Sequence, residues 1–339
     1  MTRAEPLDIP ADFAELDAVD HDVDLSQHAA WLVLVLLGLY AQRLPLLYEV
    51  VGSVAAIQGG GLYLSSDDRK QLDRIDRRVR RWHKKTFDRV RVRARKEALA
   101  LADFEGEYQA RVLRRFTGRS IKKVGLRDRK ASVVRLTFEG RTLDEHLATL
   151  QRASVNAVMR DITEGVKAEE GAETILERVR GDEDQDQAGT TAKTRRDIKR
   201  VALTANTHVS NAMRVRIAER NKDLFDRIIH TSVLDGRTSK ICISLAGKVY
   251  RVGEPIRVPP LHWNCRSMLR VVQKGKPLPN VPTAEQWLKA MPVARQNEIL
   301  GEEVAGWWRG GQIELRGLVT DNLRPLSLSE LRRKARRNR

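Results

Sequence analysis

The feature that most restricts the fold of this chain is a strongly basic stretch, residues 68–106, with one narrow apolar seam. Its apolar residues recur at steps of three to five positions, the spacing of one face of an α-helix. They are Leu72, Ile75, Val79, Trp82, Phe87 and Val90. Between positions 69 and 96 there are 14 Lys or Arg and three Asp. The pattern predicts a long helix that packs along one stripe and exposes its positive charge.

The whole chain shares this basic character, with a formal net charge of +17. One interpretation is a solvated helix face that keeps the protein soluble, and the other is contact with a polyanion. We expect non-specific contact with double-stranded DNA, because self-repulsion between cations is relieved most beside phosphates. The expected contact residues are Arg77, Arg78, Arg80, Arg81, Lys84 and Lys85, together with Arg332, Arg333, Lys334, Arg336 and Arg337 of a basic C-terminal tail.

The segment before the basic helix begins with an acidic arm, residues 1–28, which we expect to be poorly ordered up to a helix N-cap at Ser26. The apolar run Ala29–Tyr40 that follows is too short for a membrane-spanning helix, which needs roughly 20 residues. It predicts a helix that other elements enclose, and no membrane partner is expected. Pro45 then bends or restarts the helix, Gly59–Gly61 breaks the chain, and Ser65–Asp68 offers the next N-cap.

The second half of the chain changes from helical to strand patterning. Helices are predicted at 143–158, 173–179 and 192–222, a strand at 131–138 and a loop at 181–187. Short β-branched runs at 228–233, 248–252 and 267–273 predict an antiparallel sheet. The expected class is α+β and predominantly helical, with long helices and a small antiparallel sheet.

This patterning predicts five consecutive parts. They are an acidic arm (1–28), a helical N-terminal region (29–140) containing the basic helix (68–106), an α+β domain (141–275), a helical C-terminal module anchored by Trp287, Trp307 and Trp308 (280–330), and a mobile basic tail (331–339). Two cysteines do not make a disulfide framework and fit a chain made in a reducing cytoplasm.

Both cysteines lie near one histidine, in a segment that concentrates the residues able to do chemistry. Cys242 ends the run Asp235-Gly-Arg-Thr-Ser-Lys-Ile-Cys, and Pro259-Pro-Leu-His-Trp-Asn-Cys-Arg brings His262 and Cys265. Asp235 and Thr238 are expected to satisfy backbone donors at a turn into a short helix. Gly236 and Gly247 are expected to allow tight backbone geometry, and the two prolines to stiffen the loop.

Several chemistries fit this cluster. A zinc site would use Cys242, His262 and Cys265, with Asp235 or His230 as a fourth ligand. A Cys242–Cys265 disulfide or a Cys/His nucleophile pair are alternatives. The interpretation that we favour is a buried polar network, formed by Asp235, Arg237, Asn264 and Arg266, that fixes the loop to the sheet. No cofactor is required by that network, and zinc is compatible with it.

The paired motifs resemble those of the phage Mu F-like head-morphogenesis family. The resembling residues are Asp235, Gly236, Arg237, Thr238, Ser239 and Cys242, then Gly247, then Pro260, His262, Asn264, Cys265 and Arg266. Ala205–Thr207 and Asn211 of the preceding helix are also similar to the family, and the likeness extends over about residues 143–331. Ser267 occupies a position at which some relatives are expected to have a further cysteine, and the lack of this ligand makes a metal site less favoured.

The resemblance implies a minor capsid protein of a tailed phage with no catalytic residue. It implies a place inside the head near the portal, contact with the portal or major capsid protein, and a role in head assembly and in DNA packaging or ejection. During assembly the protein would be in the host cytoplasm. The alternative is a metal-dependent nuclease or peptidase that uses Asp235, His262 and the cysteines.

Overall fold

The structure, a computed structural model, describes residues 11–57, 64–135, 137–181 and 189–338, with the side chains described from Asp20 onward. Helices predominate, and the one sheet has three antiparallel strands, so the predicted α+β class is confirmed. The chain divides into two compact units. The helical unit comprises His21–Ala100 and Val133–Asn206, and the sheet unit comprises Leu101–Ser132, Thr207–Arg339 and the residues before His21.

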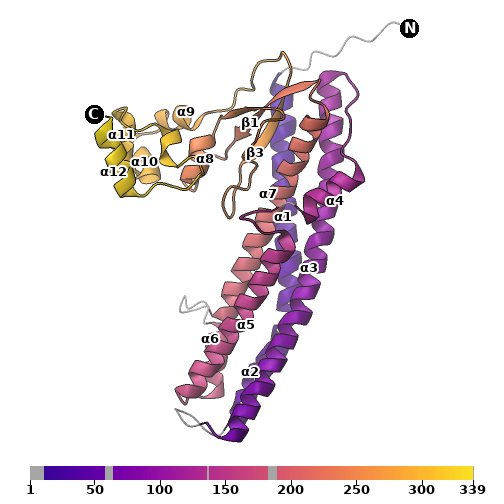
Figure 1. Ribbon diagram of the computed structural model, residues 1–339, viewed down its shortest axis with the longest axis vertical. Coiled ribbons are helices and arrows are strands. Elements are labelled where there is room, and N and C mark those ends of the chain that lie inside the picture. The colour runs from indigo at the N-terminus through magenta and orange to yellow at the C-terminus, as the bar shows by residue number, and fades with distance from the viewer. Residues whose placement is uncertain (1–10, 58–63, 136, 182–188, 339) are drawn as a thin grey trace. The chain divides into compact units, whose positions relative to one another are not determined.

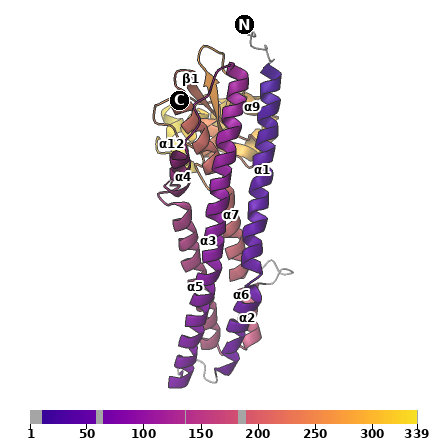
Figure 2. The same ribbon diagram turned by 90° about the vertical axis from the view of Figure 1, so that its right-hand side faces the viewer.

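The helical unit is a bundle of long antiparallel and parallel helices. It contains most of α1 (Ala11–Ala41), α2 (Leu44–Gly52), the short 3-10 helix η1 (Ser53–Ala56), α5 (Leu143–Lys167), α6 (Ala172–Arg180), and the first parts of α3 (Ser66–Thr117) and α7 (Thr190–Arg220). Figures 1 and 2 show α1, α3, α5 and α7 running side by side. Pro45 lies in the first turn of α2, which confirms that it restarts the helix.

Helix α3 confirms the predicted basic helix and extends beyond it at both ends. Ser65 caps its start, because the Ser65 Oγ accepts the backbone N–H of Asp68 at 3.0 Å while the Asp68 carboxylate accepts the Ser65 N–H. Of the predicted seam, Ile75, Val79, Trp82, Phe87 and Val90 are buried, and Leu72 is half-buried. One stripe therefore enters the core while the basic residues face outward.

The acidic N-terminal segment differs from the prediction. Residues 11–28 are helical, not poorly ordered. The helix of the apolar run extends toward the N-terminus, because the residues before it have adequate helix propensity. Ser26 is not an N-cap; it lies inside α1, and its Oγ donates to the carbonyl of Asp22. Residues 1–10, the glycine triplet at 59–61 and most of the predicted loop at 181–187 lie outside the described residues.

The apolar run of α1 is enclosed on one side only, which corrects the expectation of burial all round. Leu32, Leu36 and Tyr40 are buried, whereas the side chain of Leu34 is 70% exposed and that of Trp31 is 42% exposed. Within the described part of the chain, Asp20–Ala56 is the one helical segment long and apolar enough to cross a membrane by length and composition, and a third of its most apolar window is buried. The helix thus presents an uncovered apolar face.

The strand predicted at 131–138 is wrong. Most of that segment belongs to α4 (Leu126–Val134), and only Phe138 makes an isolated bridge, with Arg141. The β-branched composition is overridden because Ser132 bonds back to the carbonyl of Asp128 and Val133 is buried. The helices predicted at 143–158 and 173–179 are confirmed by α5 and α6, and the one at 192–222 by α7.

The sheet unit contains the three predicted strands in the order β2–β1–β3. They are β1 (Phe225–Thr231), β2 (Val249–Arg251) and β3 (Met268–Gln273), and both pairings are antiparallel. Ile228 and Leu269 pack with Ala218 of α7 on one face of the sheet. The short helix α8 (Lys240–Leu245) lies between β1 and β2 in the chain. This framework positions the two motif segments.

The C-terminal part of the sheet unit is a small helical module. It contains α9 (Ala284–Lys289), α10 (Val293–Leu300), α11 (Glu302–Arg309), the 3-10 helix η2 (Leu315–Leu318) and α12 (Leu328–Arg337). Thr283 is the N-cap of α9, and the three predicted tryptophans contribute to the module's core. The basic tail is not mobile but forms α12, because Leu331 and Ala335 are buried in that core.

Candidate functional site

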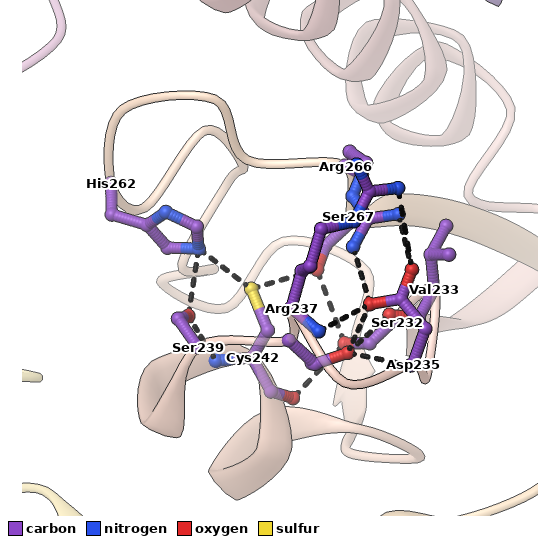
Figure 3. Close-up of polar contacts among 10 residues, drawn as sticks. Ser232, Val233, Asp235, Arg237, Ser239, Cys242, His262, Arg266 and Ser267 are labelled. Atoms are coloured by element: carbon purple, nitrogen blue, oxygen red, sulfur yellow. Dashed lines mark hydrogen bonds and ion pairs between the residues drawn. The ribbon is translucent and has the colours of Figure 1, made fainter. Parts of the chain in front are cut away.

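The two motif segments are joined by an ion pair between Asp235 and Arg266. Two guanidinium nitrogens of Arg266 donate to the two carboxylate oxygens of Asp235, each at 2.7 Å (Figure 3). Such bidentate pairs are directional as well as charged. The Arg266 guanidinium therefore holds the pKa of Asp235 well below its usual range. The pair is half-exposed, so the network predicted to be buried lies at the surface.

The turn after Asp235 leads into α8 as the sequence predicted. The Thr238 Oγ accepts the Asp235 backbone N–H at 2.8 Å and donates to the carbonyl of Val233 at 2.7 Å. Asp235 also accepts the backbone N–H of Arg237 at 2.9 Å. Ser239 is the N-cap of α8, and its Oγ accepts the backbone N–H of Cys242. These hydrogen bonds fix the position of Cys242 at the start of α8.

Cys242, His262 and Cys265 come together as the sequence predicted. The Cys242 Sγ lies 3.0 Å from the Nε2 of His262 and 3.7 Å from the Sγ of Cys265 (Figure 3 shows the first of these contacts). The three donor atoms all lie within 4.8 Å of one another. Both thiols are buried, and His262 is half-buried.

Hydroxyl groups surround the cluster. The Ser267 Oγ donates to the Cys242 Sγ at 3.1 Å, and the Ser239 Oγ lies 2.8 Å from the His262 Nε2. A hydrogen bond from Cys242, helped by one from His262, lowers the pKa of the Cys265 thiol, and the bond to Cys265 raises the pKa of His262. The cluster therefore favours one thiolate, which is the form that binds soft cations.

Several residues that position the cluster were absent from the predicted site. The Thr207 Oγ donates to the Cys265 carbonyl at 2.9 Å, and the Asn211 amide donates to the Ser267 carbonyl at 3.1 Å. The Asn211 side chain also accepts the Leu269 backbone N–H at 2.7 Å. Thr207 and Asn211 are one turn apart on α7, in the part of the helix that resembles the family, so the sequence signal for them was present.

The remaining motif residues have simpler roles. Asn264 is exposed with φ of +58°, and Arg237 is exposed beside Asp235, so neither extends a buried network. Gly247 adopts φ of +82°, and a Cβ there would lie 2.8 Å from Thr283, which confirms the need for glycine. Gly236 has no such positive φ. Pro260 is buried next to Pro259 in the loop.

The predicted DNA-contact residues are all on helices. Arg77, Arg78, Arg81 and Lys85 fall within about 100° of the circumference of α3. They are exposed and form no ion pair with any residue in the described ranges, whereas Arg80 pairs with Asp76 and Lys84 with Asp88. On α12, Arg332 pairs with Glu303, and Lys334 donates to the Gly317 carbonyl. Arg333, Arg336 and Arg337 remain exposed.

Together these features describe a helix-backed sheet with a firmly bonded loop, which is a structural module. The family model described as "Phage Mu protein F like protein" matches residues 155–270, a range that includes the Asp235–Arg266 pair and all three cluster residues. The match confirms the resemblance over this part of the chain. No curated protein and no solved structure matches the chain.

Proposed function

We propose that this protein is a minor capsid protein of a tailed bacteriophage that lies inside the head, near the portal. It acts in head assembly and in DNA packaging or ejection, and it is in the host cytoplasm before assembly. The observation that carries the proposal is the family match over residues 155–270. The alternative, a metal-dependent nuclease or peptidase, is less well supported, because Arg266 engages both oxygens of Asp235 and the thiols are closed off from a substrate.

The helical unit offers a surface for the portal or major capsid protein. A groove of about 710 Å³ runs between α1 and α3, with Leu34, Leu39 and Val92 among its apolar lining residues. Leu34 and Val92 are 70% and 71% exposed. Exposed apolar patches of this kind mark interaction sites. Three cations, Arg89, Arg93 and Lys96, line the groove against one carboxylate, that of Asp88, so the groove fits an apolar helix with acidic flanking residues.

The second contact is with double-stranded DNA, through the exposed cations of α3 and α12. The four cations at 77, 78, 81 and 85, which form no ion pair with any residue that the structure describes, make one continuous basic face, as a contact with successive phosphates requires. That contact would be independent of DNA sequence, because phosphates carry no sequence information. The rest of the positive charge is partly neutralised by neighbouring carboxylates.

The partner contact is tested by incorporation of the protein into procapsids. Leu34→Lys with Val92→Lys places two charges in the groove and is expected to reduce incorporation at least tenfold, without unfolding the protein. The control is Val293→Lys with Leu328→Lys, which changes two exposed apolar residues of the sheet unit.

Unchanged incorporation of the groove variant would contradict the proposed surface. The same would follow if the purified protein floated with phospholipid vesicles and the groove variant did not, because a membrane would then be the partner of this face.

A further inference from the structure

Three atoms able to bind a metal, two sulfurs and one imidazole nitrogen, already lie close together in the sheet unit. The two sulfurs and the Nε2 of His262 lie within 4.8 Å of one another. Thiolate and imidazole are the ligands that zinc prefers. The Nδ1 of His262 is 2.9 Å from the Trp263 carbonyl, so it donates there and leaves Nε2 free to coordinate. A carbonyl in that position is typical of the residues that orient metal-binding histidines.

A fourth candidate is His230, on β1. Its side chain is completely buried, and neither ring nitrogen has a hydrogen-bond partner in the described part of the chain. Buried polar atoms are nearly always bonded, so two unpartnered nitrogens on one ring need an explanation. A metal ion would occupy one of them.

His230 lies on the same side of the sheet as the cluster. Residues directly opposite one another on antiparallel strands share a face, and His230 lies opposite Leu269, which packs with Ala218 of α7. The Ser232 Oγ donates to the Cys242 carbonyl at 3.0 Å and lies 3.1 Å from the Ser267 Oγ, which in turn contacts the Cys242 sulfur. The same helix, α7, binds the cluster, because the Thr207 Oγ donates to the Cys265 carbonyl, so His230 and the cluster both lie on the α7 side of the sheet.

We propose that Cys242, His262, Cys265 and His230 bind one Zn²⁺ in a closed tetrahedral site. Asp235, the other fourth ligand suggested by the sequence, is excluded because both of its oxygens bind Arg266. Four protein ligands leave no open position, so the ion is structural and not catalytic. It links β1, α8 and the loop at 262–265, three segments that would otherwise be held together by short polar contacts. The proposal does not depend on the protein's role in the virion.

The direct test is metal analysis of the full chain, purified without chelator. We expect one zinc per chain, and X-ray absorption with two sulfur and two nitrogen ligands. Replacement by Co²⁺ should give the intense visible bands of tetrahedral cobalt and a thiolate charge-transfer band. A folded protein that binds no zinc, or one in which Cys242 and Cys265 form a disulfide, would overturn the proposal. Two sulfurs with one nitrogen would overturn the assignment of His230.

A pair of matched variants separates His230 from a general effect of losing a buried histidine. His230→Gln is expected to lower zinc affinity more than tenfold, while His83→Gln, at a completely buried histidine of the helical unit, leaves it unchanged. Unchanged affinity and unchanged cobalt spectrum in His230→Gln would contradict the fourth ligand. If His230→Gln fails to fold, the ligand count of the unaltered protein still decides the question.

Discussion

Glu105 of α3 and Arg214 of α7, 109 positions apart in the chain, form a buried ion pair. The Arg214 Nε donates to the Glu105 Oε1 at 2.8 Å, and both side chains are almost fully inaccessible. Arg214 also donates to the Leu269 carbonyl at 3.3 Å, so the pair joins α3, α7 and β3 within the sheet unit. The loop that holds the cysteine cluster leads directly into β3, which this pair fixes to the helices.

Breaking this pair is expected to destabilise the sheet unit strongly. Glu105→Ala leaves the Arg214 charge buried without its partner and should lower the free energy of unfolding by about 3–5 kcal/mol. Chemical denaturation followed by circular dichroism measures the loss. Replacing both residues with apolar ones of similar size, Glu105→Leu with Arg214→Met, should recover most of it. A loss below about 1 kcal/mol in the single variant would show that the pair is not a structural link.

The Asp235–Arg266 pair is expected to contribute less and to depend on pH. Both side chains are more than one-third exposed, so Asp235→Asn should cost about 1 kcal/mol at neutral pH. The pKa of Asp235 is lowered in the folded protein, mainly by Arg266, so the stabilisation is complete above the ordinary Asp pKa and is lost as the pH falls below it. Denaturation at pH 7 and pH 3 should show that the free energies of unfolding of the unaltered protein and of Asp235→Asn become more alike at the lower pH. A difference that stays the same at both pH values would contradict this explanation.

His83 gives the helical unit a different pH dependence. Burial lowers the pKa of this histidine to about 4, and its ring lies between the Val79 carbonyl and the Ser154 hydroxyl. Because the unfolded chain binds the proton more readily, stability is complete above pH 6.5 and declines as the pH falls toward 4. His83→Gln should flatten the thermal-unfolding profile between these values. His146→Gln, at a partly buried histidine of the same unit, is the control for loss of a histidine, and equal flattening in both variants would contradict this explanation.

Neutralising the basic face of α3 is expected to weaken DNA binding and its salt dependence. Changing Arg77, Arg78, Arg81 and Lys85 to Gln removes up to four phosphate contacts, which reduces the slope of log K against log salt by at most about 3.6. The measurement is fluorescence anisotropy with duplex DNA at several salt concentrations. The control removes four exposed, ion-paired cations elsewhere: Lys123, Lys289, Arg295 and Arg316. Equal effects in both variants would mean that net charge alone explains binding.

Much of the fold could be predicted from sequence because its signals are local. The seam of α3, the restart at Pro45 and the three strands each follow from periodicity or from a single residue's geometry. The strand expected at 131–138 failed because β-branched residues there sit in a helix whose packing outweighs their preference. The tail became α12 for a similar reason, since two small apolar contacts, Leu331 and Ala335, order an otherwise charged segment.

The site residues could be predicted where reactive side chains lie close together in the sequence. They could not be predicted where they depend on packing between segments that are far apart in the chain. The clustering of both cysteines near His262 was visible in the chain. Asp235 and Arg266 were predicted to share a polar network, but that network was expected to be buried and to include Asn264, which is exposed. The ion pair of Glu105 with Arg214 was not visible in the chain, because nothing in either local sequence indicates that α3 and α7 meet at that level. The sequence likewise does not show that both ring nitrogens of His230 are buried without a hydrogen-bond partner among the described residues; only the folded sheet shows this.

The most direct test of the proposed role is to quantify the protein in purified phage heads before and after DNA release, with protease added from outside. We predict a low copy number relative to the major capsid protein, resistance to protease in full heads, and cross-linking to the portal or major capsid protein. Absence from purified heads, or complete digestion by external protease in intact particles, would contradict the account.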